Sequence, residues 1–428
     1  MGRIRVVIAG GGWCGCSAAL SAAKAGASVT LLERTDQLLG TGLVGGIMRN
    51  NGRFTAAEEA IAMGAGDLFE ICDRVARHRN IAFPGHSHAT LYDVAKVEPA
   101  VRRHLLDYGI DIHLQSRATD VVMEGTRVKA LVDADEKRFD GDAFVDATGT
   151  AGPQGNCTKY GNGCAMCVLR CPSFGPRVSI AAKAGVKEFI GGTSKGTLGS
   201  MSGSCKLLKE SLSGEIIEKL DETGVAVIPI PDDLRKKDAL ATKCCQQYAL
   251  PEFAENLILL DTGHAKLMTP YFPLEVLRKV PGMENARFED PYAGGKGNSM
   301  RYFAISPRDD YLRVDGVDNL FCGGEKAGPL VGHTEAMVTG ALAGHNAVRY
   351  ATGMDLLKIP ESTAIGDAIA LVGRLVKTGE ALSRKYTFSG SVYFERMKDL
   401  GMYTTDREAI RRRVRDAGVE GALGRRIA

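Results

Sequence analysis

Glycines near the start of the chain have the spacing of a phosphate-binding turn. Gly10, Gly12 and Gly15 form a G-x-G-x-x-G pattern within RVVIAGGGWCGCSAAL. The first glycine of such a pattern permits a tight turn, the second lets the backbone approach a pyrophosphate, and the third lets a helix pack closely on a strand. The following helix offers N–H groups and its positive dipole end to the phosphates. The spacing predicts a dinucleotide site; the alternative is a turn that binds nothing.

An acidic residue and a second glycine cluster extend this pattern. Glu33 stands 18 residues after Gly15, where a carboxylate can accept a hydrogen bond from a ribose hydroxyl. The next glycines predict a loop whose backbone passes close to a large ligand, unless they form only a flexible connection. These glycines are Gly40, Gly42, Gly45 and Gly46.

Cysteines later in the chain have the spacing of metal ligands. Cys164, Cys167 and Cys171 form C-x2-C-x3-C followed by Pro172, and Cys157 lies seven residues before them. Bacterial ferredoxin loops have a similar spacing, which predicts a [4Fe–4S] cluster. Four thiolates also suit a structural zinc site, and the cysteines could instead be buried free thiols. Spacing alone does not separate the two metals.

Apolar periodicity predicts the elements that position these residues. A strand, a helix and a second strand cover residues 4–33, and the run DAFVDATGTAG at 142–152 predicts a strand that ends in a turn. Three or four short strands are expected between 111 and 141, and AVIPIP predicts another. Helices are expected over 55–78, over 92–108 with an interruption near Pro99, over 205–224, from about Gly332 onward, and through most of the chain after residue 353.

Composition restricts the class of protein. The formal net charge of +3 demands no polyanionic partner, although the arginines of REAIRRRVRD could contact RNA or simply form a solvated helix face. No apolar run reaches the roughly 18 residues that a membrane span needs. The first strand starts near Arg3, so we expect no signal peptide and a cytoplasmic protein. In that compartment eleven cysteines indicate thiols or metal ligands rather than disulfides.

Several segments together resemble a known group of enzymes. AGGGWCGCSAA, Glu33, GTGLVGGI and VDATG resemble the glutathione-reductase-type FAD-dependent oxidoreductases. In the C-terminal half, VPGMENARF, NLFCGGE and GHTEAMVTGALAGHNA are similar to the glucose-inhibited division protein A family and its folate-dependent tRNA uridine methyltransferase relatives. The resemblance covers roughly residues 1–150 and 276–370.

The resemblance implies a cofactor and its binding residues. FAD would contact the following residues: Gly10, Gly12, Gly15, Glu33, Gly45, Thr148, Gly149, Gly324 and Glu325. Polar candidates for catalysis around the flavin are His333, Glu325 and Arg301, with Arg308 nearby in the sequence. The N-terminus of a helix that begins near Gly332 would direct its positive end toward a developing flavin anion.

The expected fold is α/β, with a discontinuous Rossmann-like FAD-binding domain, an inserted α+β substrate domain and a helical C-terminal tail. The first part of the FAD-binding domain would cover 1–155 and its return segment 276–352. The inserted domain with the cysteine motif would cover 156–275 and the helical region 353–428.

We expect an FAD-dependent oxidoreductase in which a [4Fe–4S] cluster relays electrons from a ferredoxin-like donor to FAD and on to a small organic molecule. The alternative is an FAD-dependent enzyme that modifies tRNA or rRNA, as uridine methyltransferases do. A third hypothesis is a flavin- or zinc-holding scaffold or redox sensor. The sequence predicts no membrane partner and leaves a homo-oligomer open.

Overall fold

The centre of the molecule is a five-stranded parallel sheet with the strand order β19-β10-β1-β2-β6. In this computed structural model the described residues are 3–149, 171–192, 200–201, 205–236, 240, 246–269, 272–289, 300–301 and 304–428. The strands are β1 (Arg5–Ala9), β2 (Ser28–Leu32), β6 (Asp111–His113), β10 (Ala143–Asp146) and β19 (Leu320–Cys322). Because β19 pairs with β10, a segment from late in the chain completes the sheet that β1 begins. This is the discontinuous Rossmann-like core predicted from the sequence.

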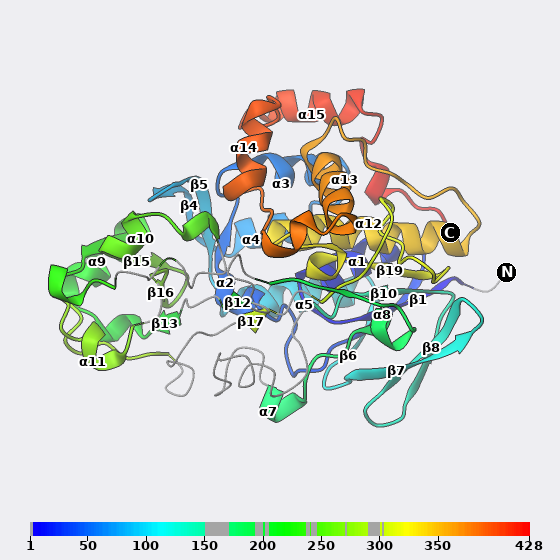
Figure 1. The fold of residues 1–428 in the computed structure, drawn as a ribbon, viewed down its shortest axis with the longest axis horizontal. Coiled ribbons are helices and arrows are strands. Elements are labelled where there is room, and N and C mark those ends of the chain that lie inside the picture. The colour runs from blue at the N-terminus through cyan, green and yellow to red at the C-terminus, as the bar shows by residue number, and fades with distance from the viewer. Residues whose placement is uncertain are drawn as a thin grey trace.

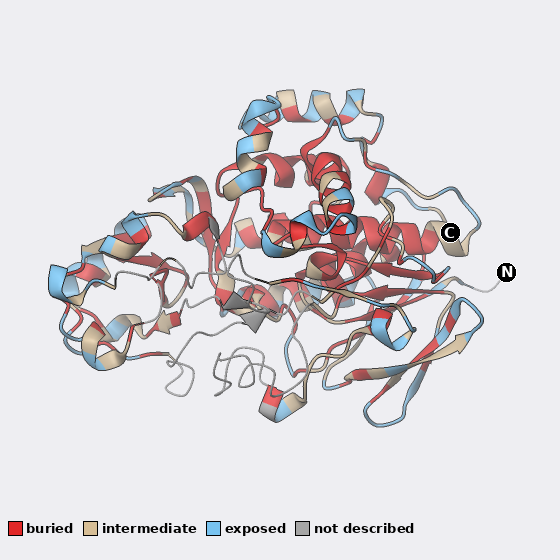
Figure 2. Ribbon diagram, in the orientation of Figure 1, coloured by how far each residue is buried: buried red, intermediate tan, exposed pale blue. Residues whose placement is uncertain are grey.

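Two helices pack against this sheet and against each other, α1 (Trp13–Lys24) and α12 (His333–Ala351). Small residues allow the close approach. A Cβ on Gly340 would lie 2.2 Å from the carbonyl oxygen of Cys14, and one on Gly344 would lie 2.1 Å from that of Ala18. Figure 2 shows that buried residues concentrate where these helices meet the sheet.

Antiparallel sheets surround the core. One is a hairpin with a third strand, formed by β7 (Ala118–Glu124), β8 (Arg127–Asp133) and β9 (Arg138–Asp140). A second has the order β3-β5-β4, with bounds Ile47–Met48, His86–Tyr92 and Ala76–Phe83. Two-stranded pairs join β11 (Phe189–Ile190) to β18 (Ala304–Ile305), and β12 (Ser200–Met201) to β17 (Met300–Arg301).

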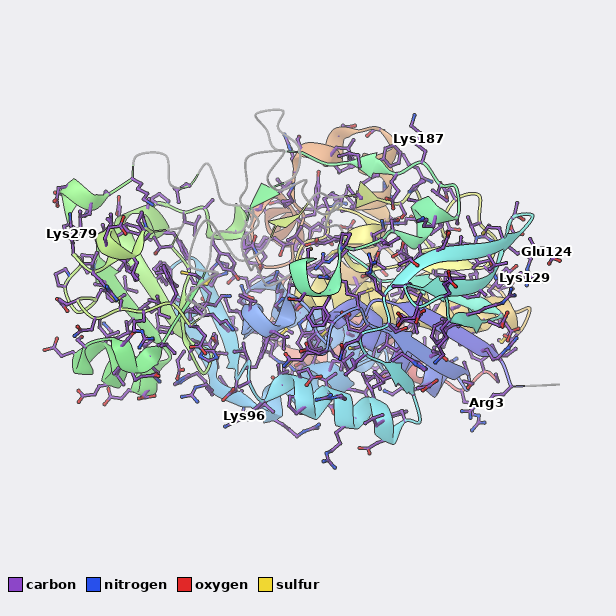
Figure 3. The ribbon with its side chains drawn as sticks, turned by 90° about the horizontal axis from the view of Figure 1, so that it is seen from below. Arg3, Lys96, Glu124, Lys129, Lys187 and Lys279 are labelled. Atoms are coloured by element: carbon purple, nitrogen blue, oxygen red, sulfur yellow. The ribbon has the colours of Figure 1, made fainter. Side chains whose placement is uncertain are left out.

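The inserted layer lies to one side of the core and contains a four-stranded sheet (Figure 1). Its order is β13-β16-β15-β14, with bounds Cys205–Leu207, Ala265–Leu267, Asn256–Asp261 and Val225–Pro229. Its apolar cluster continues past the expected boundary at residue 275, because Leu277, Val280 and Phe288 pack within it. In Figure 3, Lys279 marks this layer, and Glu124 and Lys129 mark the β7–β8 hairpin at the other end of the molecule.

The remaining helices lie around these sheets. They are α2 (Gly42–Gly45), α3 (Gly52–Ala62), α4 (Asp67–Arg74), α5 (Val97–Asp107), α7 (Cys171–Phe174), α8 (Ile180–Lys183), α9 (Gly214–Thr223), α10 (Glu252–Glu255), α11 (Leu274–Leu277), α13 (Ala364–Lys377), α14 (Ser391–Asp399) and α15 (Arg407–Asp416). Within the part of the chain that the structure describes, no helix has the length and apolar character needed to cross a membrane.

The C-terminal helices are attached to the core through buried charges. Glu59 of α3 accepts hydrogen bonds of 3.0 Å from the backbone N–H groups of Ala364 and Ile365 at the start of α13, and it pairs with Arg413 of α15. A carboxylate at a helix N-terminus is stabilised by the helix dipole. The helical tail is therefore part of the folded core and not a loose extension.

Three predicted elements differ from the structure. The stretch 55–78 is two helices followed by β4, since Gly64, with φ +89°, ends the first helix. Helix α5 is continuous because Pro99 stands in its first turn, where no N–H donor is needed. Residues Cys205–Leu207 form β13 rather than the start of a helix, because they pair with β16.

His345 makes stability sensitive to acid. This α12 side chain is fully buried, and within the described structure neither ring nitrogen has a hydrogen-bond partner. Burial, reinforced by Arg349 and Arg425, lowers its pKa to about 4. An unfolded histidine has a pKa near 6.5. As pH falls below that value the unfolded state binds a proton that the folded state excludes, so stability is lost between about pH 6.5 and pH 4.

We predict that replacing His345 with Leu removes part of this acid sensitivity. At pH 5 the proton taken up by the unfolded state costs wild-type protein roughly 2 kcal/mol relative to neutral pH. Thermal unfolding at pH 7.5 and pH 5.0 should show a smaller loss for His345→Leu than for wild type. His88→Leu, in the β4–β5 hairpin, is the control for the removal of a histidine, and only its difference in stability between the two pH values is compared with that of wild type. An equal loss in all three proteins would contradict the prediction.

Candidate functional site

A cavity of about 370 Å³ opens at the carboxyl ends of the central strands. Open α/β sheets bind ligands at this edge. Residues from the core line most of it: Gly10, Gly12, Glu33, Arg34, Gly40, Arg117, Thr148, Gly149, Arg177, Gly324, Glu325 and His333. The inserted layer contributes Cys205, Lys206, Phe288 and Glu289. Most of the predicted site residues therefore gather around one space.

The three glycines of the first turn have different roles. Gly10 has φ +100°, and a Cβ there would lie 2.5 Å from the carbonyl oxygen of Ala147. A Cβ on Gly15 would lie 1.7 Å from the carbonyl oxygen of Gly10, so α1 packs directly on the turn. A Cβ on Gly12 would meet no described atom within 4 Å, and this residue lines the cavity. Gly10 and Gly15 thus shape the turn, whereas Gly12 leaves space for a ligand.

Helix α1 begins beside this space without a side-chain cap. Its N-cap is Gly12, which has no side chain to accept a hydrogen bond from the first turn. The first N–H groups of a helix need partners from outside the helix. Since the first turn of α1 contains no acidic residue, a phosphate at this position would meet a favourable dipole without a competing charge.

Glu33 is buried at the end of β2 and lines the cavity. Its two carboxylate oxygens accept hydrogen bonds of 2.8 Å from the backbone N–H groups of Gly11 and Thr35. A carboxylate has about four acceptor positions, so these bonds fix its orientation and leave capacity for a ligand hydroxyl. Glu33 can therefore accept a hydrogen bond from a ligand hydroxyl at the cavity wall.

Asp146, at the end of β10, fixes the turn that contains Thr148 and Gly149. Its Oδ1 accepts hydrogen bonds from the backbone N–H and the hydroxyl of Thr148, at 3.1 and 2.6 Å. Gly149 follows with φ +74°, and a Cβ on it would lie 2.8 Å from Nη1 of Arg177. The Asp-Ala-Thr-Gly segment is therefore a fixed turn at the cavity wall.

The N-terminus of α12 forms another wall. His333 begins this helix, and its Nδ1 lies 3.5 Å from the hydroxyl of Tyr92, which donates a 2.6 Å hydrogen bond to the carbonyl oxygen of Gly42. A Cβ on Gly45 would lie 1.7 Å from Cε1 of the His333 ring. Gly45 therefore supports His333 from behind, and it does not itself line the cavity.

Two cysteines of α1 near the cavity are not poised as nucleophiles. Burial is the main cause that raises the pKa of Cys14 and of Cys16, and neighbouring acidic groups raise it further. The thiolate is the reactive form of cysteine, and buried apolar surroundings disfavour it. Cys14 instead packs against Gly323 and Gly340 of the opposite segments.

The inserted layer closes the far end of the cavity with charged and aromatic side chains. The backbone N–H of Glu289 donates a 2.9 Å hydrogen bond to the carbonyl oxygen of Lys206, which aligns the two segments. The Glu289 carboxylate lies 3.1 Å from Nδ1 of His264. Burial, followed by the charge of Lys206, lowers the pKa of His264. Sequence patterns did not indicate this wall, because its members come from separate strands and loops.

Several candidates lie elsewhere or outside the described residues. Arg301 belongs to β17, but its side chain is not among those described. Arg308 is buried and donates hydrogen bonds to the carbonyl oxygens of Ala327 and Ile369, so it is a structural residue. His86 is a buried member of β5, and its ring stacks on that of Phe83.

The metal hypothesis cannot be placed on the described residues. Cys157, Cys164 and Cys167 lie outside them, and Cys171 is buried at the start of α7. Within the described ranges, no three or more His, Cys, Asp or Glu side chains form a group that could hold a metal ion. Neither the [4Fe–4S] cluster nor zinc gains support from the structure.

Comparisons with known proteins agree with this geometry. The family model for glucose inhibited division protein A matches residues 5–249 and 259–355. A methylenetetrahydrofolate–tRNA-(uracil-5-)-methyltransferase TrmFO of Fervidobacterium nodosum is 34% identical over 117 residues, which are 27% of this chain and 25% of that protein. The protein of the same name from Methylobacterium radiotolerans is 30% identical over 149 residues, 34% of this chain and 30% of that protein. The matches thus span less than a third of these curated relatives.

Solved structures share the fold over nearly the whole chain. Aquifex aeolicus GidA in its form II crystal covers 99% of this chain and 74% of its own, with a TM-score of 0.69 and 16% identity. The form I crystal gives a TM-score of 0.59 and covers 97% of this chain and 78% of its own. At this identity the likeness establishes the fold alone. Because the family model matches most of its length, the chain belongs to the glucose inhibited division protein A family.

Proposed function

We propose that the protein is an FAD-dependent enzyme that modifies uracil in tRNA. Membership of the glucose inhibited division protein A family is the observation on which this rests. The names of the curated relatives favour a reaction at C5 of uracil with a folate one-carbon donor. This is the alternative considered from the sequence, and the comparisons favour it over an iron–sulfur electron relay.

Several groups that line the cavity suit FAD. Open space at Gly12 and the start of α1 would receive the pyrophosphate, and Glu33 would accept a ribose hydroxyl. The isoalloxazine would lie toward Gly324, Glu325 and the start of α12. When bound, FAD supplies hydride and electron transfer, while the protein supplies binding, orientation and electrostatics.

The N-terminus of α12 would stabilise negative charge on the bound cofactor. Its 19 residues direct the positive end of the helix dipole toward the cavity, where negative charge is stabilised. His333 occupies this end and is held between Trp13, Tyr92 and Gly45. Because the His333 imidazole is held on three sides, it could present one ring nitrogen to a reacting group without a change of side-chain conformation.

The inserted layer is the proposed side for the nucleobase. Phe288, Lys206 and Glu289 line this side of the cavity and would supply an aromatic ring, a donor and an acceptor. Stacking combined with hydrogen bonds to base edges is how proteins recognise single unstacked bases in RNA. The two-sided cavity would therefore bring cofactor and base together while excluding water.

The proposed function predicts that the protein binds and modifies tRNA. Wild-type protein loaded with FAD should bind an unmodified tRNA transcript. The logarithm of the association constant should fall linearly with the logarithm of the salt concentration, because binding to phosphates releases counterions. With a reductant and methylenetetrahydrofolate, nucleoside mass spectrometry should show a uridine altered at C5. A tRNA whose uridines already carry a C5 methyl group is the control substrate. Absence of both binding and modification would remove the proposal.

Two glycine variants form a matched test of the cofactor site. Gly12→Val should fold with the melting temperature of the wild-type apoprotein but lose bound flavin, because its side chain enters empty cavity space. Gly15→Val should destabilise the protein by about 1–3 kcal/mol or more, because its side chain meets the backbone of Gly10. Flavin absorbance and thermal unfolding measure the two effects. A fully flavinated Gly12→Val protein would contradict the assignment.

Metal binding by the cysteine motif can be tested separately. An iron–sulfur centre predicts about four irons and four acid-labile sulfides per chain in anaerobically purified protein. Cys167→Ser should then remove the iron and leave FAD in place. Zinc in place of iron would favour the structural site, and unaltered iron in the variant would show that these cysteines are not the ligands.

A further inference from the structure

Arg177 is a charged side chain of the cavity that the assignments above do not use. It lies between α7 and α8, is partly buried, and lines the cavity. Among the residues that the structure describes, its guanidinium has no hydrogen-bond acceptor and no ion-pair partner. Arginine carries five N–H donors and stays charged, so a cavity arginine without a protein partner calls for an anionic ligand.

Its surroundings place this guanidinium above the middle of the sheet edge. Nη1 lies 2.8 Å from the position of a Cβ on Gly149, which follows β10. It also interacts electrostatically with Glu33, after β2, and with Glu325, after β19. A Cβ on Gly10 would lie 2.5 Å from the carbonyl oxygen of Ala147, in the same turn as Gly149, so Arg177 lies beside the turn that contains Gly10 and Gly12.

Backbone contacts on both sides hold Arg177 there. Nη1 of Arg34 donates a 2.6 Å hydrogen bond to the carbonyl oxygen of Gly175, and Nη1 of Arg117 donates one of 3.4 Å to that of Pro176. After Arg177, the backbone N–H of Ala181 donates a 3.0 Å hydrogen bond to Oδ2 of Asp146. Asp146 thus fixes both the Thr148 turn and the segment that bears Arg177.

Other arginines lie near the Arg177 guanidinium. Burial, followed by the like charge of Arg34, lowers the pKa of Arg177 to about 10, and the group remains protonated at neutral pH. Arg34 and Arg117 line the same cavity, and the positive end of the α1 dipole faces it. A diphosphate would offset this repulsion, and the planar guanidinium fork matches phosphate oxygens.

We propose that Arg177 binds the diphosphate of the dinucleotide from the side opposite α1. This rests on the proposed function, since it takes FAD as the ligand. The diphosphate would then lie between the N-terminus of α1 and the guanidinium, and the segment that follows the cysteine motif would form part of the cofactor site.

The test compares Arg177→Met with Arg138→Met, which removes an exposed arginine of β9 paired with Asp140. Affinities of the apoproteins for FAD, ADP and adenosine are measured by flavin fluorescence and by competition. A charge-assisted hydrogen bond is lost only with diphosphate ligands, so Arg177→Met should bind FAD and ADP about 10- to 100-fold more weakly than wild type. Adenosine should bind all three proteins alike.

The outcomes separate this proposal from the cofactor assignment. If wild type and Arg138→Met fail to bind FAD, the cofactor assignment fails and this proposal falls with it. If both bind FAD and Arg177→Met matches them within twofold, only the role of Arg177 is overturned. An equal loss for adenosine would also overturn it, because that indicates a general structural effect.

A second variant covers the case in which Arg177→Met does not fold. Arg177→Lys keeps the charge but loses the bidentate fork, and it should bind FAD and ADP more weakly than wild type by about tenfold. It should retain wild-type affinity for adenosine. Wild-type affinity of Arg177→Lys for ADP would overturn the proposal.

Discussion

The close approach of backbone to backbone at the first turn is the constraint on which the rest of the structure depends. Helix α1 rests on Gly10 through Gly15, and α12 rests on α1 through Gly340 and Gly344. No side chain larger than hydrogen fits at these contacts, because a Cβ on Gly15, Gly340 or Gly344 would lie only 1.7 to 2.2 Å from a backbone carbonyl oxygen of the opposite segment. The N-termini of α1 and α12 therefore lie close to the ends of β1, β2, β10 and β19, and all of them border one cavity.

Buried charges connect distant segments to this layer. Arg53 of α3 pairs with Glu335 of α12 at 3.2 Å, and both are buried. Glu335 also accepts hydrogen bonds from the hydroxyl of Thr387 and the N–H of Phe388. Buried ion pairs contribute little net stability unless their remaining donors and acceptors are satisfied, as they are here. The function of these contacts is to set positions: they attach the C-terminal region behind the α12 wall of the cavity.

Charged side chains in the core and at the cavity differ in their protein partners. Lys326 is completely buried and satisfied by Glu188 and Ser179, whereas Arg177 lines the cavity without such a partner among the described residues. A buried or cavity-lining charge without a hydrogen-bonded partner is a position where a ligand can provide the counter-charge. The cavity between the core and the inserted layer therefore has arginines on the side of the central sheet and Lys206, Phe288 and Glu289 on the other side.

The sequence by itself determined the parts of the site whose chemistry depends on local spacing. Gly10, Gly12 and Gly15 lie within one turn and the helix after it, so their roles follow from short-range geometry, and the β1–α1–β2 unit was predicted with it. The same holds for the turn at Thr148 and Gly149 and for the start of α12. The resemblance of the C-terminal half to the glucose-inhibited division protein A family was likewise visible in contiguous motifs.

Only the tertiary structure decided which distant residues meet. Gly45 supports the His333 ring from a position almost 300 residues earlier in the chain. Arg177 reaches the strand ends because Asp146 binds the backbone at Ala181. Lys206 and Glu289 become neighbours through pairing of segments some 80 residues apart. No local periodicity encodes such contacts, since they arise from the summed packing of helices and sheets; for that reason the sequence indicated the cofactor turn but not the opposite wall.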